Sequence, residues 1–133
     1  MIVFVDTNVL FSSILYPLSI PSLVINKILT GPFDLAISDY CLQELIVVFK
    51  KKAPNALDKI DAFVSTSSRI NVYKVSNVTI DIEKNLRDLK DGPVIRGAIE
   101  NCADIIITGD KDLLELKIDK PVIITPREFL ENY

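Results

Sequence analysis

The chain has 133 residues, of which 49% are hydrophobic, and a net charge of −3 at neutral pH. This composition excludes an intrinsically disordered chain and predicts one domain spanning residues 1–133. It also lacks the bulk positive charge with which many proteins bind nucleic acid, so any work on RNA requires a local device such as metal ions.

The sequence contains no histidine, which excludes several enzyme classes. Catalytic triads and most zinc sites use imidazole, and two cysteines cannot complete a cysteine-only zinc site. Any chemistry must therefore use carboxylates, lysines, hydroxyls or a metal bound by oxygen. Cys41 and Cys102 both fall in apolar helical patterns, and we expect two small core residues rather than a disulfide.

The apolar runs are short. The first one stops at Asp6, which is too early for a signal peptide, and none approaches the roughly 20 residues that a membrane span requires. We therefore expect a cytoplasmic protein without a membrane partner.

Strand and helix patterns alternate along the chain. In order, strands are predicted at Ile2–Val5, Asp34–Ile37, Ile70–Val75, Asp104–Thr108 and Pro121–Ile124. Helices are predicted between them and at the end, within residues 21–30, 39–52, 55–64, 92–102 and 125–133. The first and fourth strands are continuously apolar, which is typical of a parallel sheet covered by helices on both faces. The sequence thus predicts an α/β fold with a central, mainly parallel sheet.

Acidic residues follow the predicted strands. Asp6 ends the first strand, Glu44 lies in the helix after the second, and Asp91 begins the helix that leads into the fourth. Asp110 and Asp112 follow the fourth strand. Ligands of α/β sheets bind outside the carboxyl ends of the strands, so these acids are expected near one edge. Oxygen ligands of this kind select hard cations such as Mg²⁺ or Mn²⁺.

Each acid also has a purely structural interpretation. Asp6, Thr7 or Asn8 could cap a helix that begins near Val9, and Asp91 could cap its own helix. Asp112 and Glu115 resemble a capping pair, and Asp110 could be a turn residue.

Glu44 is harder to explain structurally. Its helical neighbours Tyr40, Cys41, Val47 and Val48 are apolar or nearly so, which predicts a partly enclosed position. A carboxylate in such a place requires a nearby cation or a proton.

Four segments in this order resemble the motifs of the PIN-domain family, and most closely its toxin-like branch, the VapC-type ribonucleases. They are "VDTNVL", "SDYCLQEL", "LKDGPVIRGAIENCAD" and "IIITGDKDLL". The resemblance implies a three-layer α/β/α sandwich and an Mg²⁺- or Mn²⁺-dependent ribonuclease.

The resemblance also assigns roles. The family's catalytic and metal-binding acids match Asp6, Glu44, Asp91 and Asp110, and a further acidic position matches Asp112. Asn8 and Thr108 match supporting polar residues of the same motifs. Relatives often carry more acids near Asp91, so no spare ligand is expected there.

Three basic features are weaker candidates for contact with RNA. Lys111 stands between two candidate ligands and could reach a phosphate. Arg96 could do the same or be a solvated charge on its helix. The lysines of "FKKK" end a helix, where they suit its dipole.

Two other functions are open. A PIN-like domain could bind RNA or protein without cutting, although degenerate members tend to lose acids that this chain keeps. An aspartyl-phosphate phosphatase or receiver is disfavoured, because that phosphatase chemistry requires an aspartate where Asn8 stands.

Partners are implied mainly by the resemblance. A toxin would have a small antitoxin protein that covers the acidic groove, and relatives often form homodimers. The apolar stretch Ile14–Ile25 could be such a partner face or ordinary core.

Overall fold

The computed structural model describes all of residues 1–133, and its centre is a five-stranded parallel sheet with the strand order β3-β2-β1-β4-β5. The strands are β1 (Ile2–Val5), β2 (Asp34–Ser38), β3 (Ile70–Tyr73), β4 (Ile105–Ile107) and β5 (Val122–Ile124). All five predicted strands are present, with small differences at their ends. The predicted α/β class is therefore confirmed.

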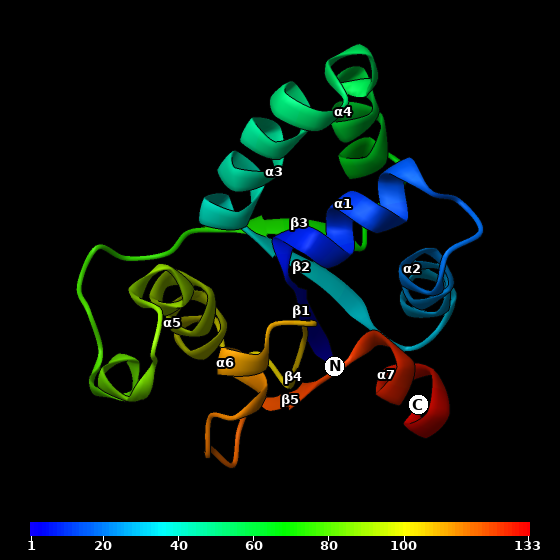
Figure 1. Cartoon of the computed structure of the whole chain (residues 1–133). Helices are drawn as coiled ribbons and strands as arrows, with labels where there is room; N and C mark the ends of the chain where they lie inside the picture. The colour runs from blue at the N-terminus through cyan, green and yellow to red at the C-terminus, as the bar shows by residue number, and fades with distance from the viewer.

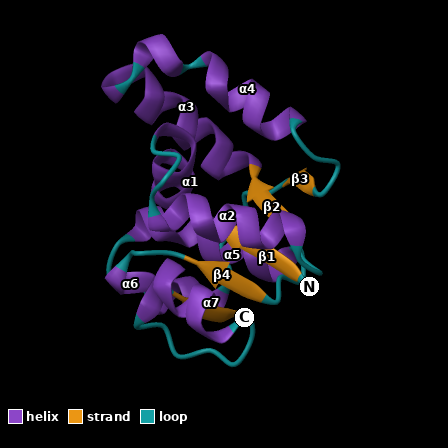
Figure 2. Ribbon diagram, turned by 90° about the vertical axis from the view of Figure 1, so that its right-hand side faces the viewer, coloured by secondary structure: helices purple, strands orange, loops and turns teal.

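Helices cover both faces of this sheet. They are α1 (Thr7–Leu15), α2 (Ile20–Thr30), α3 (Asp39–Lys52), α4 (Asp58–Ser65), α5 (Gly92–Glu100), α6 (Lys111–Leu114) and α7 (Pro126–Asn132), with 3-10 turns η1 (Pro54–Ala56), η2 (Asp81–Asn85) and η3 (Leu89–Asp91). In Figure 1, α1 to α4 lie on one side of the sheet and α5 and α6 on the other. Figure 2 shows α3 and α4 as a helical pair that stands above the strands. The expected three-layer sandwich is the observed architecture.

The inner strands form the core. Val3 on β1, Leu35 on β2 and the whole of β4 (Ile105–Ile107) are fully buried. Strands covered on both faces have no solvent side, which explains the continuous apolar runs in place of alternation. The carboxyl ends of these parallel strands consequently share one edge of the sheet.

Side-chain caps fix the helix starts. The Ser38 hydroxyl accepts a hydrogen bond from the amide of Cys41 at 3.0 Å and starts α3 directly after β2. Thr125 and Glu128 form the predicted capping box at α7, with both reciprocal bonds at 3.1 Å. Such caps satisfy amides that have no partner within the helix.

The segment between β3 and α5 has no periodic pattern and is held by a buried ion pair. Arg96 on α5 donates to both carboxylate oxygens of Glu83, at 2.8 and 3.0 Å, and to the carbonyl of Ser76 at 2.6 Å. The prediction that Arg96 is a solvated charge or a phosphate contact is wrong, because its guanidinium is buried and fully engaged. Gly92 is required beside this pair, since a Cβ there would collide with the Glu83 carboxylate.

The two cysteines differ. Cys41 is buried, as predicted, but Cys102 is exposed, and the prediction of a core residue there is wrong. The helical pattern continues to Cys102 in sequence, whereas α5 ends at Glu100 and Cys102 turns the chain with a φ of 55°. That left-handed conformation directs its side chain away from the core.

The apolar stretch Ile14–Ile25 divides between core and surface. Val24 and Ile25 are buried, whereas Tyr16, Leu18 and Leu23 are exposed, with Leu18 at 94%. No single helix has the length and apolar character to cross a membrane, although α1 and α2 together, bent by 96°, meet those two criteria.

Candidate metal centre

Asp6 joins the end of β1 to the start of α1. One carboxylate oxygen accepts from the Thr7 amide at 2.7 Å and caps α1, and the other accepts from the Thr108 hydroxyl at 2.8 Å. The side chain is buried, and burial raises the pKa of Asp6, while the bonds from Thr108 and Thr7 oppose that rise. Asp6 is thus a helix cap that also faces the other acids, so the two interpretations are compatible.

Glu44 reaches the same place from α3. Its carboxylate accepts a hydrogen bond from the Thr7 hydroxyl at 2.9 Å, which ties it to the residue beside Asp6. Burial, followed by the negative charge of Asp6, raises the pKa of Glu44, while the hydroxyl opposes that rise. The predicted partly enclosed position is observed, with the Thr7 hydroxyl as hydrogen-bond donor and the positive charge of Lys90 acting on the same carboxylate.

Asp91 is the acid with the least compensation. It stands at the N-cap position of α5 but makes no capping bond, and its Oδ2 is buried with no hydrogen-bond partner. Burial and the neighbouring carboxylate of Asp110 raise the pKa of Asp91 to about 7. Capping does not explain this residue.

Asp110 and Asp112 follow β4. Asp110 caps the short helix α6 by accepting from the Asp112 amide at 2.8 Å, and its own amide donates to the Thr108 hydroxyl at 3.0 Å. The predicted capping pair of Asp112 and Glu115 is therefore wrong, because the cap lies two residues earlier. The side chain of Asp112 is left to face Asp91 and Asp110, and oxygens of these three acids lie within 4.8 Å of one another.

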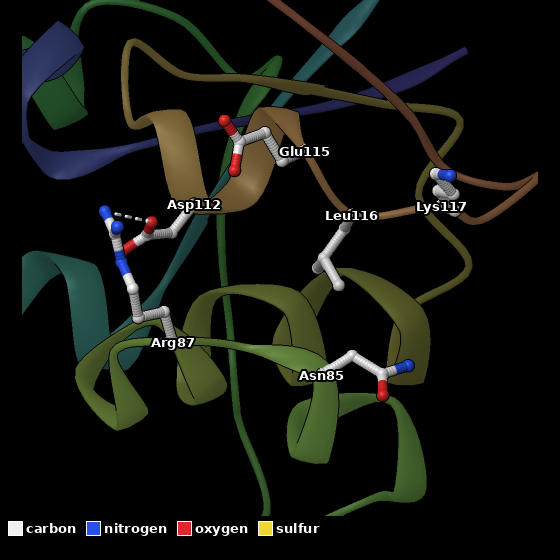
Figure 3. A pocket seen from close by; sticks show the side chains of 6 residues that line it. All are labelled: Asn85, Arg87, Asp112, Glu115, Leu116 and Lys117. Atoms are coloured by element: carbon white, nitrogen blue, oxygen red, sulfur yellow. Dashed lines mark ion pairs between the residues drawn. The ribbon is translucent and has the colours of Figure 1, made fainter.

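A surface arginine approaches this cluster. Arg87, whose side chain is 84% exposed, forms an ion pair with Asp112 at 2.8 Å, as Figure 3 shows. Asp112 is largely buried, so the pair joins a surface side chain to the acidic cluster. The pair supplies the cluster with one compensating positive charge.

Two residues near Asp91 were not predicted. Asp88 and Lys90 line the same pocket as Asp6, Glu44 and Asp91. Asp88 precedes Asp91 by one turn of 3-10 helix, and its charge contributes to the raised pKa of Asp91. Asp88 is thus a second acid near Asp91 that was missed, although it is not in the cluster of Asp91, Asp110 and Asp112, and its spacing from Asp91 in "RDLKD" was the available signal.

The other candidates lie at different distances from the acids. Asn8 is exposed and lines the pocket, and Thr108 is buried between Asp6 and Asp110 as a bridge. Lys111 is exposed on α6 and does not line the pocket. Arg96 belongs to the ion pair with Glu83.

The pocket suits a divalent cation. It has a volume of about 190 Å³, and its walls include the carboxylates of Asp6, Glu44, Asp88, Asp91 and Asp110. Clustered carboxylates repel one another, and a buried oxygen without a partner is costly. Asp112 does not line this pocket, but an ion held between its carboxylate and those of Asp91 and Asp110 would remove both penalties, and oxygen ligands favour Mg²⁺ or Mn²⁺.

Comparisons with known proteins concern the family and the fold of the chain. A family model of the PIN domain matches residues 2–112. The uncharacterized protein MJ1680 of Methanocaldococcus jannaschii is 32% identical, over 98% of this chain and 90% of that protein.

Two solved structures are similar in fold. A chain of VapBC2 from Rickettsia felis, bound to a DNA fragment from its promoter, matches 93% of this chain and 97% of its own length, with a TM-score of 0.69 and 20% identity. VapC20 of Mycobacterium tuberculosis, a toxin that cleaves the sarcin-ricin loop, matches 86% of this chain and 96% of its own, with a TM-score of 0.61 and 14% identity. At these identities the likeness concerns the fold alone.

Proposed function

Because the chain belongs to the PIN-domain family, we propose that it is a metal-dependent ribonuclease that hydrolyses RNA phosphodiester bonds with Mg²⁺ or Mn²⁺. The observation that carries the proposal is the buried, unpartnered carboxylate oxygen of Asp91 among other acids. A structural acid would have a partner, as Glu83 has. An acid that binds a cation has no such partner in the ion-free chain.

The residues of the proposed site have different roles. Asp91, Asp110 and Asp112 hold the cation, while Asp6 and Glu44 complete the acidic wall. Thr108 fixes Asp6 relative to Asp110, and Thr7 fixes Glu44. When bound, the ion supplies positive charge against the phosphate and activates water for attack. Lys90 is the basic side chain that lines the pocket and is available to phosphate oxygens.

We also propose a cytoplasmic toxin role with a protein partner. The similar chain from Rickettsia felis belongs to a VapBC complex, and VapC20 is a toxin, which supports a small antitoxin as the partner. The exposed side chains of Tyr16, Leu18 and Leu23 provide an apolar surface for that antitoxin or for a second copy of the chain.

The test is cleavage of RNA by purified protein in Mn²⁺. We expect Asp6→Asn and Asp91→Asn to lose roughly 100-fold or more in rate, because each removes a charge from the acidic wall. Asp119→Asn, which changes an exposed acid in the α6–β5 connection, should cut like the wild type. Equal cutting by all four proteins would show that the activity belongs to a contaminant or another site. Metal binding by calorimetry without any cleavage would instead identify a binding module.

A further inference from the structure

A second hollow lies beside the acidic pocket, at the carboxyl end of β3. It has a volume of about 430 Å³, and its walls include Tyr40 and Gln43 of α3, Asn77 of the segment after β3, and Pro93 of α5. In Figure 1 the chain leaves β3 and passes between the start of α3 and α5. The hollow therefore opens on the same edge of the sheet as the acids.

This hollow is continuous with the acidic pocket along α3. Tyr40 and Gln43 also line a smaller depression with Glu44, Val47 and Val48, and Glu44 and Val48 line the acidic pocket. These side chains follow one another at helical spacing, so they form one face of α3. We call the hollow and this smaller depression together the Tyr40 groove.

Tyr40 stands at the boundary between the groove and the acids. Its hydroxyl donates to the carbonyl of Lys90 at 3.4 Å, and Lys90 lines the acidic pocket. A group resting on the Tyr40 ring would thus be adjacent to a phosphate in that pocket.

The charged residues that line the larger hollow are already engaged. The Asp39 carboxylate accepts from the amides of Tyr40 and Val75, at 2.8 and 3.1 Å, and Arg96 is committed to Glu83. The remaining functional groups are the Tyr40 ring and the exposed amides of Gln43 and Asn77. A planar, neutral ligand with hydrogen-bonding edges fits this set better than a phosphate does.

We propose that the Tyr40 groove binds a nucleobase of the RNA strand next to the phosphate in the acidic pocket. Tyr40 provides the stacking surface, and Gln43 and Asn77 contact the base edge, so the groove selects single-stranded substrates whose bases are free to stack. This inference rests on the proposed ribonuclease function, because it takes RNA as the ligand.

Binding is measured apart from cleavage. A short oligoribonucleotide carrying 2-aminopurine is titrated against the Asp91→Asn protein, and fluorescence reports both binding and stacking. In that background we expect Tyr40→Leu to weaken binding roughly tenfold and to lose the quenching, while Tyr40→Phe stays within about twofold of its parent. Tyr133→Leu, which removes an exposed tyrosine at the C-terminus, away from the groove, is the matched control. Thermal melting verifies that each variant is folded.

The outcomes separate the two proposals. Tyr40-dependent binding supports the groove even if the wild type never cleaves RNA. If Tyr40→Leu binds the oligonucleotide and quenches its fluorescence as its parent does, the proposal that the groove binds a base is overturned, even if the wild type cleaves RNA. Asn77→Ala is a second probe, on a different segment. We expect it to alter the relative affinities for oligonucleotides that differ only in the base next to the cleavable phosphate. An unaltered preference in both Asn77→Ala and Gln43→Ala would reject the role of the amides.

Discussion

Glu83 and Asp91 lie in the same irregular segment before α5, yet their carboxylates differ in their hydrogen-bond partners. Glu83 is buried and accepts two bonds from Arg96 and a third from the amide of Ile80, and these bonds lower its pKa. Asp91 has a buried oxygen without any partner, and burial beside Asp110 raises its pKa to about 7. The chain itself supplies partners for the carboxylate of Glu83, whereas it leaves one oxygen of Asp91 without any.

The difference separates structural acids from functional ones. A buried carboxylate with all its partners holds the fold, and its removal leaves an arginine without a counter-charge. A buried carboxylate without partners costs stability, so its retention requires a benefit elsewhere, such as binding a cation. The following predictions test this distinction in order of decreasing effect.

The largest expected change in stability is at Glu83. Glu83→Gln leaves Arg96 buried without a counter-charge and should lower the free energy of unfolding by about 3 kcal/mol. Denaturant unfolding measures this. Lys84→Gln breaks the neighbouring exposed pair with Asp81 and should cost less than about 0.5 kcal/mol. If the two variants lose the same amount, the buried pair does not anchor the segment.

The pH dependence of stability tests Asp91. Its folded pKa of about 7 lies above the unfolded value of 3.8, so the proton favours the folded state. This contribution is complete below about pH 4 and is lost as the pH rises through 7. In EDTA, the wild type should therefore lose on the order of 2 kcal/mol more than Asp91→Asn between pH 4 and pH 8.

Thermal melting of the wild type and Asp91→Asn between pH 4 and pH 8 measures this difference in stability. Added Mn²⁺ at pH 8 should stabilise the wild type and have little effect on Asp91→Asn, because the ion binds the folded state through this carboxylate. Identical pH profiles for the two proteins would mean that Asp91 ionises without cost, and the contrast with Glu83 would disappear.

Thr108 tests how the acids are held. Thr108→Val removes the donor to Asp6 and the acceptor for the Asp110 amide, so we expect a loss of about 1 kcal/mol in stability and of roughly tenfold in Mn²⁺ affinity. Thr108→Ser keeps the hydroxyl and should retain most of that affinity. Calorimetric titration compares them, and equal affinity in Thr108→Val would show that the bridge does not position the ligands.

Arg87 provides the smallest effect. Arg87→Gln frees Asp112 from an exposed ion pair, so stability should change by less than about 1 kcal/mol while Mn²⁺ affinity rises by roughly two- to threefold. Lys117 lines a hollow together with Arg87 and Asp112 (Figure 3), and Lys117→Gln, which removes a positive charge there without breaking an ion pair, is the matched control. Weaker Mn²⁺ binding in Arg87→Gln would indicate that the arginine organises Asp112 rather than competing with the cation.

Much of the fold could be predicted because its signals are local. Continuous apolar runs predicted β1 and β4, and the pattern of Thr125 and Glu128 predicted the capping box of α7. The predicted strand ends also placed Asp6 and Asp110 on one edge of the sheet. The 3-10 turns η2 and η3 have no such periodicity, so the segment that carries Asp88 was not predicted.

The proximity of the acids was predicted, but their surroundings were not. Arg96 was misinterpreted because its partner Glu83 is 13 residues away in an irregular segment. Asp112 was assigned a capping role that Asp110 fulfils, since both residues have suitable spacing and only the backbone decides between them. The groove beside Tyr40 has no sequence signal, because its walls come from separate segments.

The sequence by itself determined the class of fold, the absence of imidazole chemistry and the order of the acids along the chain. Periodicity and capping act over a few residues, so they can be read without coordinates. Only the tertiary structure decided which acids are satisfied, because those partners are distant in the chain: Thr108 reaches Asp6 across 102 positions. Packing around Asp91 left one buried oxygen without a partner, and no capping bond accounts for it.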